Sequence, residues 1–308
     1  MSPLLTMLPT ITDPVTIDGF TQPGATANTL ANGDNAVLKI EVASGSISPG
    51  QAQFFTNGLN LAASNCTIRG LVIRIGVSQS NNLVVTSGNN IIEGNFLGTN
   101  LAASARAGIF NPTILIRTSN AANNLIGGTT PAARNLISGN FVGVEVIDDT
   151  TTANLVQGNL IGTDVSGNIK LTNEYGIFCF FDANGNTFGG VPAAARNTIS
   201  GNAITGIRFG EPSKGGALNN VVQGNFIGTN VSGDAALPNG RDKFFVDSDA
   251  GIVIPANSRG DRIIQNRIAY NRGAGIRITN VSGGDINSIE IEIADNLIYA
   301  NQGLGIDL

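Results

Sequence analysis

The chain has 308 residues, of which 13% are charged, and 17 basic against 22 acidic residues give a formal net charge of −5. No run of Lys or Arg stands out that would neutralise a phosphate backbone, so we expect no nucleic acid as a partner. The complete absence of His excludes Ser–His and Cys–His nucleophilic pairs and removes the usual zinc ligand. Forty glycines with abundant Asn, Thr, Ile and Val favour a turn-rich, all-β protein.

Neither a membrane span nor a secretory signal is visible. No apolar stretch reaches the about 18 residues of a membrane helix, and residues 1–9 lack the basic start and apolar run of a signal peptide. The chain is therefore expected either inside the cell or as an excised piece of a longer exported protein. Its two cysteines, Cys66 and Cys179, lie in apolar runs far apart and are expected to be buried free thiols.

Residues 1–60 are the least regular part of the chain. Prolines interrupt short strand candidates at 15–17 and 36–42, and we interpret this part as irregular N-terminal coils. Short candidates at 58–61, 66–68, 71–75 and 83–85 lead into a regular region. We expect residues 61–308 to form one continuous domain.

From Asn90 onward the sequence repeats one unit, N-x-h-x-G-N-x-h-x-x-(N/D), a loop and then G-(I/V)-x-h, where h is apolar; its clearest copy runs from Asn154 to Ile177. Seven copies begin at Asn90, Asn124, Asn154, Asn186, Asn220, Asp261 and Asn296. Each copy holds three short strands that cannot bury a face alone, so the copies must stack. The sequence therefore predicts an all-β parallel β-helix with three strands per coil and with Ile, Leu, Val and Phe inside.

A longer period pairs the coils. Ala133-Arg134-Asn135 recurs two copies later as Ala195-Arg196-Asn197. One coil of each pair carries an insert at its first corner, and the other carries a loop before its third strand, at 101–107, 165–175 and 231–250. Since stacked strands rise about 4.8 Å per coil, these loops are expected to form a ridged edge.

The repeated asparagines are interpreted as structural, because an inward Asn amide can bond backbone groups of its own and adjacent coils and tolerates left-handed corners. Ligand binding by the same residues is the lesser alternative. Thr99, Thr163 and Thr229 form a second periodic set. They could present a flat row to ice or a glycan, but corner turns explain them better.

The segment 231–250 departs most from the repeat and is rich in charge. A polysaccharide lyase needs a basic group to remove a proton next to a uronate carboxylate, often with Ca²⁺ held by carboxylates. Arg241 and Lys243 are therefore candidate catalytic residues, Asp247 and Asp249 candidate Ca²⁺ ligands, and Asp242 a candidate ligand-binding residue. A solvated surface loop is the plainer alternative.

Asp148 and Asp149 form the only adjacent acidic pair in the chain. Glycoside hydrolysis uses two carboxylates placed across a bond, although neighbours in a turn usually point apart. Asp182 follows the equivalent strand of the next copy and would extend an acidic groove. These three are candidate ligand-binding residues.

The repeats N-x-I-x-G-N and G-I-x-I, together with D-P-V-T-I-D-G-F-T-Q-P-G at 13–24, resemble right-handed parallel β-helix repeat proteins of bacterial exported and surface chains. In its coil pattern the sequence is also similar to the pectin-lyase-like superfamily. The resemblance covers almost the whole chain and implies a right-handed coil. Of the polygalacturonase-like motifs only a D-D is present, and the D-P-H of alginate-epimerase-like members is absent.

Three hypotheses of function follow. The first is a non-catalytic β-helical segment of a larger extracellular or cell-surface protein, serving as a stalk, an adhesin or a surface that contacts a polysaccharide or cell-surface glycan. The second is a carbohydrate-active enzyme such as a Ca²⁺-dependent polysaccharide lyase. The third is a fibre subunit that associates end to end, because the sequence stops on the strand candidate 305–308 without a capping element.

Overall fold

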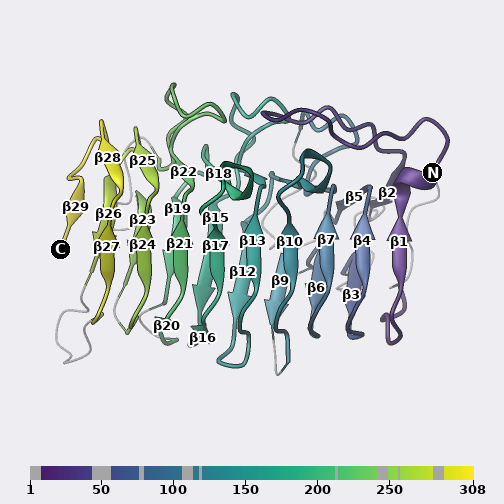
Figure 1. Cartoon of the computed structure of the whole chain (residues 1–308), viewed down its shortest axis with the longest axis horizontal. Coiled ribbons are helices and arrows are strands. Elements are labelled where there is room, and N and C mark those ends of the chain that lie inside the picture. Colours follow the sequence, from purple (N-terminus) through teal and green to yellow (C-terminus); the bar gives the residue numbers. More distant parts are fainter. Residues whose placement is uncertain are drawn as a thin grey trace, which may run out of the picture.

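The computed structural model describes residues 8–43, 57–75, 80–105, 114–117, 120–211, 214–241, 249–255, 257–279 and 288–308. Its strands form three parallel sheets of nine strands each, which run along the long axis of the molecule (Figure 1). Each turn of the chain contributes one strand to each sheet in the same order, and crossovers between parallel strands are right-handed. The predicted fold class, an all-β, right-handed parallel β-helix, is confirmed.

The strands are short, and most have two to five residues. The first sheet contains β1 (Thr16–Asp18), β4 (Thr67–Arg69), β7 (Ile91–Glu93), β10 (Leu125–Gly127), β13 (Leu155–Gln157), β17 (Thr187–Gly189), β21 (Val221–Gln223), β24 (Arg262–Ile264) and β27 (Glu292–Ala294). The second sheet contains β2 (Ile40–Ala43), β5 (Leu71–Arg74), β8 (Phe96–Leu97), β11 (Leu136–Ile137), β14 (Leu160–Ile161), β18 (Thr198–Ile199), β22 (Phe226–Ile227), β25 (Arg267–Ala269) and β28 (Leu297–Tyr299).

The third sheet contains the longest strands. Its members are β3 (Leu59–Leu61), β6 (Leu83–Val85), β9 (Ile114–Arg117), β12 (Val142–Ile147), β15 (Tyr175–Phe180), β19 (Thr205–Phe209), β23 (Ala250–Ile254), β26 (Ala274–Ile278) and β29 (Ile306–Asp307). A small sheet of β16 (Ala183–Asn184) and β20 (Ala217–Leu218) follows the third sheet, and three 3-10 turns, η1 (Gly19–Thr21), η2 (Pro131–Ala133) and η3 (Ala193–Ala195), lie in connections.

Apolar side chains stack inside the coil in columns set by the strand register. In the third sheet Val144 pairs with Ile177 and Ile177 with Ile207, and all three are fully buried. Burying one such side chain stabilises the fold by about 1.5–3 kcal/mol. Because each side chain packs against the coils on both sides, the coils are stable only as a stack. Cys66 and Cys179 are buried free thiols, as predicted.

Asparagine side chains line the corners as continuous hydrogen-bonded ladders. The backbone N–H and the side-chain amide of Asn135 both donate to Oδ1 of Asn159, at 3.3 and 3.0 Å, and Nδ2 of Asn135 also donates to the Ile92 carbonyl at 2.8 Å. The structural interpretation of the asparagines is thus confirmed. The ladder before the first sheet contains Asn90, Asn124, Asn154, Asn186, Asn220 and Asp261; that before the second contains Asn95, Asn135, Asn159, Asn197, Asn225, Asn266 and Asn296; that before the third includes Asn140, Asn173, Asn202, Asn239, Asn271 and Asn301.

The corners themselves require glycine. Gly158 has a φ of +72°, and a Cβ built on it would lie 2.0 Å from the Gly128 carbonyl of the preceding coil. The threonines of the G-T-(N/D) corners are buried as well. Thr163 is fully buried and donates to the Asp164 carbonyl at 3.0 Å, which agrees with a role in the corner.

Residues 19–39, which we call the strap, cross the outer face of the second sheet. They run along the edge of the coil from β1 towards its middle (Figure 1). Leu38 of the strap packs with the outward side chains Val72, Phe96, Leu136 and Leu160 in a second apolar cluster outside the coil. The strap therefore covers the second sheet in its N-terminal half. The division of the chain at residue 60 stays a prediction, although β1 and β2 already pair in register with β4 and β5.

Candidate functional site

Five aromatic rings form a continuous row on the outer side of the third sheet, which we call the aromatic row: Phe141, Tyr175, Phe178, Phe180 and Phe181. Successive ring centroids are 5.6, 5.6, 4.4 and 4.9 Å apart. β15 supplies Tyr175, Phe178 and Phe180. Its alternation turns Ile177 and Cys179 inward and leaves Phe178 and Phe180 on the outer side. The row ends at Phe181, which is 41% exposed.

Charged side chains flank the aromatic row. The register of β12, β15 and β19 places Glu145 and Arg208 on either side of Phe178. The Arg208 guanidinium carbon lies 5.5 Å from the Phe178 centroid, and Lys214 Nζ lies 5.8 Å from the Phe180 centroid, both within reach of a cation–π interaction. Arg208 also pairs with Glu211 at 3.2 Å. Cations and carboxylates thus border one strip of rings.

Tyr175 lies within electrostatic reach of charged side chains on the two following coils. Burial raises the pKa of the Tyr175 hydroxyl, with Arg208 opposing and with Glu211 and Asp249 adding to the rise. The phenol is therefore neutral at ordinary pH. A neutral phenol beside a guanidinium and two carboxylates can donate or accept a hydrogen bond at this face.

Two of the predicted lyase residues lie on the same side of the coil. Arg241 forms an ion pair with Glu174 at the corner that precedes β15. Asp249 is 7% exposed, and its Oδ1 has no hydrogen-bond partner among the described residues. Burial raises its pKa, while Arg241 and Arg277 oppose the rise. The structure thus brings Arg241 and Asp249 near the aromatic row. Asp242, Lys243 and Asp247 lie outside the described residues.

The predicted acidic edge lies at the far end of the row. β12 and β15 end in register at Ile147 and Phe180, so Asp148 and Asp149 follow the end of one strand, and Phe181 and Asp182 follow the end of its neighbour on the next coil. Asp148 and Asp182 stand in left-handed turns, with φ of +83° and +61°, and Asp149 and Asp182 are exposed. The three carboxylates therefore share one corner, and their role in ligand binding stays a prediction.

Within the described ranges, no group of three or more His, Cys, Asp or Glu side chains converges to hold a metal ion. Asp247, the predicted second carboxylate of the site at Asp249, lies outside the described residues. The Ca²⁺ hypothesis keeps its status as a prediction.

Sequence reasoning missed the aromatic row. The segment Y-G-I-F-C-F-F was interpreted as one more copy of the repeat, and the search then followed charge. The signal that could have found the row is the lack of polar–apolar alternation in this segment, because a strand whose even and odd positions are both apolar must place one set outside the coil.

No protein-family model and no curated protein matches the chain. Among solved structures, it is similar to the A-module of the mannuronan C-5 epimerase AlgE4 of Azotobacter vinelandii, with 12% identity over 95% of this chain and 86% of that one and a TM-score of 0.44. It is also similar to an alginate lyase from Paenibacillus sp. strain FPU-7, with 13% identity over 87% of both chains and a TM-score of 0.34. A third is the alginate lyase AlyF-OU02 in a complex, with 13% identity over 92% and 79% and a TM-score of 0.24.

The chain has a right-handed parallel β-helix fold, and its own strand pairing establishes this. Identities and TM-scores at this level carry no chemistry from one protein to another, because solenoid folds host many activities. Function must therefore be inferred from the side chains of the third sheet.

Proposed function

We propose that the protein binds a polysaccharide chain along the outer face of the third sheet, as a non-catalytic glycan-contacting segment. The aromatic row, with Arg208 and Lys214 close to two of its rings, carries this proposal. Aromatic faces pack against the apolar faces of sugar rings, and an adjacent guanidinium or ammonium pairs with carboxylates or donates hydrogen bonds to sugar hydroxyls. An acidic or partly oxidised glycan fits this combination of rings and cations.

The rigidity of the face supports binding without rearrangement. Phe178 and Arg208 stand on paired strands whose inward neighbours are fully buried. Side chains on a stiff scaffold lose little conformational entropy when a ligand arrives. The row also follows the strand β15, so that successive rings meet successive parts of an extended ligand.

Binding can be measured by affinity electrophoresis and calorimetry with uronic-acid polysaccharides and neutral polysaccharides. We expect Phe181→Ala and Arg208→Gln each to weaken binding about tenfold, since each removes a contact of roughly 1–2 kcal/mol. Arg262→Gln, which removes an exposed guanidinium of the first sheet paired with Glu292, is the matched control. Equal binding by wild type and both variants would contradict the proposal.

A polysaccharide lyase is the second candidate. One observation favours it: Arg208, Glu211 and Asp249 all lie within electrostatic reach of the Tyr175 hydroxyl. A lyase makes an unsaturated product that absorbs ultraviolet light. If uronic-acid polysaccharides with Ca²⁺ give no such absorbance, this candidate is wrong; if they do, Tyr175→Phe, Arg241→Ala and Lys243→Ala would locate the base.

The placement of the protein remains part of the proposal. Across the described ranges no helix is long and apolar enough to cross a membrane. An extracellular or cell-surface position, as part of a longer chain, suits a protein that meets a polysaccharide. The fibre hypothesis requires concentration-dependent growth in sedimentation, and a monomer at high concentration would dismiss it.

A further inference from the structure

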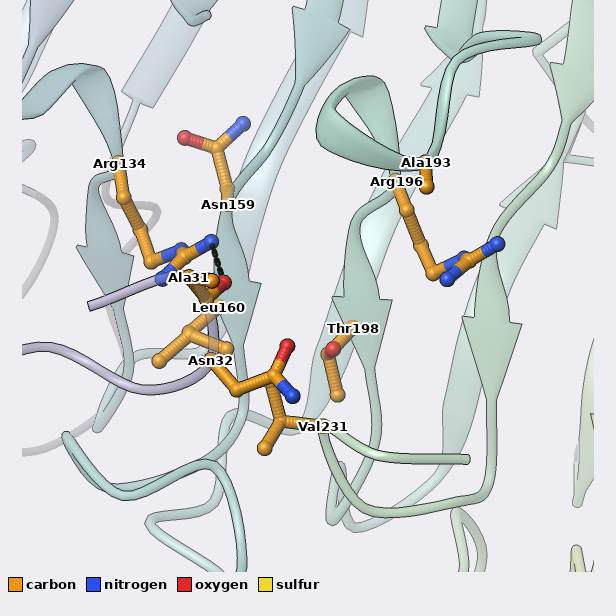
Figure 2. A pocket seen from close by; sticks show the side chains of 9 residues that line it. All are labelled: Ala31, Asn32, Arg134, Asn159, Leu160, Ala193, Arg196, Thr198 and Val231. Atoms are coloured by element: carbon orange, nitrogen blue, oxygen red, sulfur yellow. Dashed lines mark hydrogen bonds between the residues drawn. The ribbon is translucent and has the colours of Figure 1, made fainter. Parts of the chain in front are cut away.

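Two inserts at the first corner occupy equivalent positions two coils apart. Each contains a 3-10 turn, η2 or η3, followed by Ala-Arg-Asn. The Nε of Arg134 donates to the Gly158 carbonyl at 3.2 Å, and the Nε of Arg196 donates to the Gly224 carbonyl at 3.0 Å. Figure 2 shows the two arginines leaving their inserts in the same direction. The repeat thus builds the same guanidinium position twice.

The first of these positions is occupied by the strap. Nη1 of Arg134 donates to the carbonyls of Leu30, at 3.0 Å, and Gly33, while Nη2 donates to that of Ala31 at 2.9 Å. The strap also donates one hydrogen bond to the coil, from the Asp34 N–H to the Val165 carbonyl at 2.7 Å. The natural occupant of this position is therefore a tight peptide turn that presents carbonyls.

The second position has the same parts. Phe226 takes the place of Leu160 beneath the guanidinium, at 4.0 Å from the Arg196 guanidinium carbon, and Val231 takes the place of Val165 in the aligned G-T-(N/D)-V-S-G loop. Within the described residues, only the Nε of Arg196 donates a hydrogen bond, and no backbone N–H donates to the Val231 carbonyl. The guanidinium donors and the carbonyl acceptor that hold the strap at the first position therefore make no such hydrogen bonds at the second position within the described residues.

The two positions differ in charge. At the first position the residue one coil beyond Leu160 is Thr198, whereas at the second position the residue one coil beyond Phe226 is Arg267. The Arg267 guanidinium carbon lies 5.0 Å from the Phe226 centroid. Burial lowers the pKa of Arg196, and Arg267 lowers it further. An occupant that carries a carboxylate would relieve this repulsion, and the strap itself places Asp34 close enough to Arg134 for a Coulomb interaction.

A pocket of about 40 Å³ lies beside the second position. Ala31 and Asn32 at the tip of the strap form one wall, and Ala193, Arg196 and Val231 belong to the other (Figure 2). It has room for a few water molecules or one small polar group. The tip of the strap therefore borders a small polar pocket, and the Arg196 guanidinium lies on the opposite side of that pocket.

We propose that Arg196, Phe226 and Val231 form a docking site for a second strap-like peptide supplied by a partner chain. The peptide fitted by this chemistry is a tight turn that offers backbone carbonyls to Arg196, one N–H to the Val231 carbonyl, and an acidic side chain towards Arg267. The occupied position at Arg134 supplies each of these features. This site is independent of the glycan face on the third sheet.

The test uses a labelled peptide of residues 26–37, which contains the strap turn, and fluorescence anisotropy with the full chain. We expect saturable binding that Arg196→Gln weakens about tenfold or more, as expected for the loss of two or three charge-assisted hydrogen bonds, and that Arg196→Lys weakens less. Arg262→Gln serves as the control, a scrambled peptide tests sequence dependence, and circular dichroism checks the folding of each variant.

Three results would overturn the proposal. Absence of binding to the wild type would do so directly. Binding that Arg134→Gln abolishes and Arg196→Gln leaves intact would mean that the peptide exchanges with the protein's own strap. A rise in Tm with sulfate at constant ionic strength that Arg196→Gln removes, without peptide binding, would assign the position to an oxyanion instead.

Discussion

Asp261 replaces asparagine in the ladder before the first sheet, and the exchange leaves one buried atom without a partner. Its Oδ1 accepts from the backbone N–H and the side-chain amide of Asn220, at 2.8 and 3.1 Å, as an asparagine would. Its Oδ2 has no hydrogen-bond partner in the described part of the chain, whereas the Nδ2 of Asn220 donates to the Ala183 carbonyl at 3.0 Å. Burial raises the pKa of Asp261 to about 7, against the opposing bonds from Asn220.

The raised pKa of Asp261 predicts a loss of stability as the pH rises from about 4 to about 7. The folded state keeps the Asp261 proton up to about pH 7, whereas the unfolded chain releases it near 3.8. Stability is therefore full below about pH 4 and falls as the pH rises to about 7. Asp261→Asn should remove this fall and raise the free energy of unfolding at pH 8 by about 2–4 kcal/mol, measured by urea denaturation across pH.

The control for this prediction is Asp149→Asn, which removes the same charge from an exposed turn. It should leave the pH dependence as in the wild type. If Asp261→Asn and Asp149→Asn behave alike, Asp261 does not hold its proton in the folded state.

Asn159 tests the ladders more generally. It is 1% exposed, its Oδ1 accepts both bonds from Asn135, and its Nδ2 donates to the Ile126 carbonyl at 2.9 Å. Asn159→Ala leaves these groups buried and unpaired, so we expect a loss of about 2–5 kcal/mol in the free energy of unfolding. Asn32→Ala, at an exposed position of the strap, should change it by less than about 0.5 kcal/mol.

At the scale of elements, the strap depends on Arg134. Three carbonyls of residues 30–33 accept from this one guanidinium, and hydrogen bonds to charged groups contribute roughly 1.5–3 kcal/mol each. Arg134→Gln should therefore speed hydrogen exchange of residues 26–37 at least about tenfold while the coils stay protected. Arg196→Gln removes the equivalent arginine without a strap and should leave this exchange unchanged; equal effects would show that Arg134 does not anchor the strap.

The coils could be predicted from the sequence because Asn90, Asn124 and the later copies repeat the rules for building them. Strand, corner and ladder depend on local spacing, which one sequence displays. The strap could not be predicted in this way, since its contacts with Val72, Leu136 and Arg134 join residues far apart and outside the repeat.

The candidate site was predicted only in part. Arg241 and Asp249 were found by their charge in an irregular segment, and they do lie on the side of the aromatic row. Phe178 and Phe180 were missed because inward and outward apolar residues look alike in sequence. Which face of β15 is covered depends on its neighbours β12 and β19.

In the whole molecule the three faces of the coil differ. The first sheet carries exposed ion pairs such as Arg262–Glu292, the strap covers the N-terminal half of the second, and the third carries the aromatic row. A long ligand needs a face that is rigid, apolar in its centre and charged at its margins. We therefore infer that the outer face of the third sheet is the ligand-binding face.

Hydroxyl-radical footprinting of the full chain, with and without a uronic-acid polysaccharide, tests this most directly. The account predicts that the polysaccharide protects Tyr175, Phe178 and Phe181 from oxidation. It leaves the edge-to-face pair Tyr270–Tyr299, whose ring centroids lie 5.5 Å apart at the second sheet, as reactive as before. Protection of Tyr270 and Tyr299 with an unprotected aromatic row would contradict it.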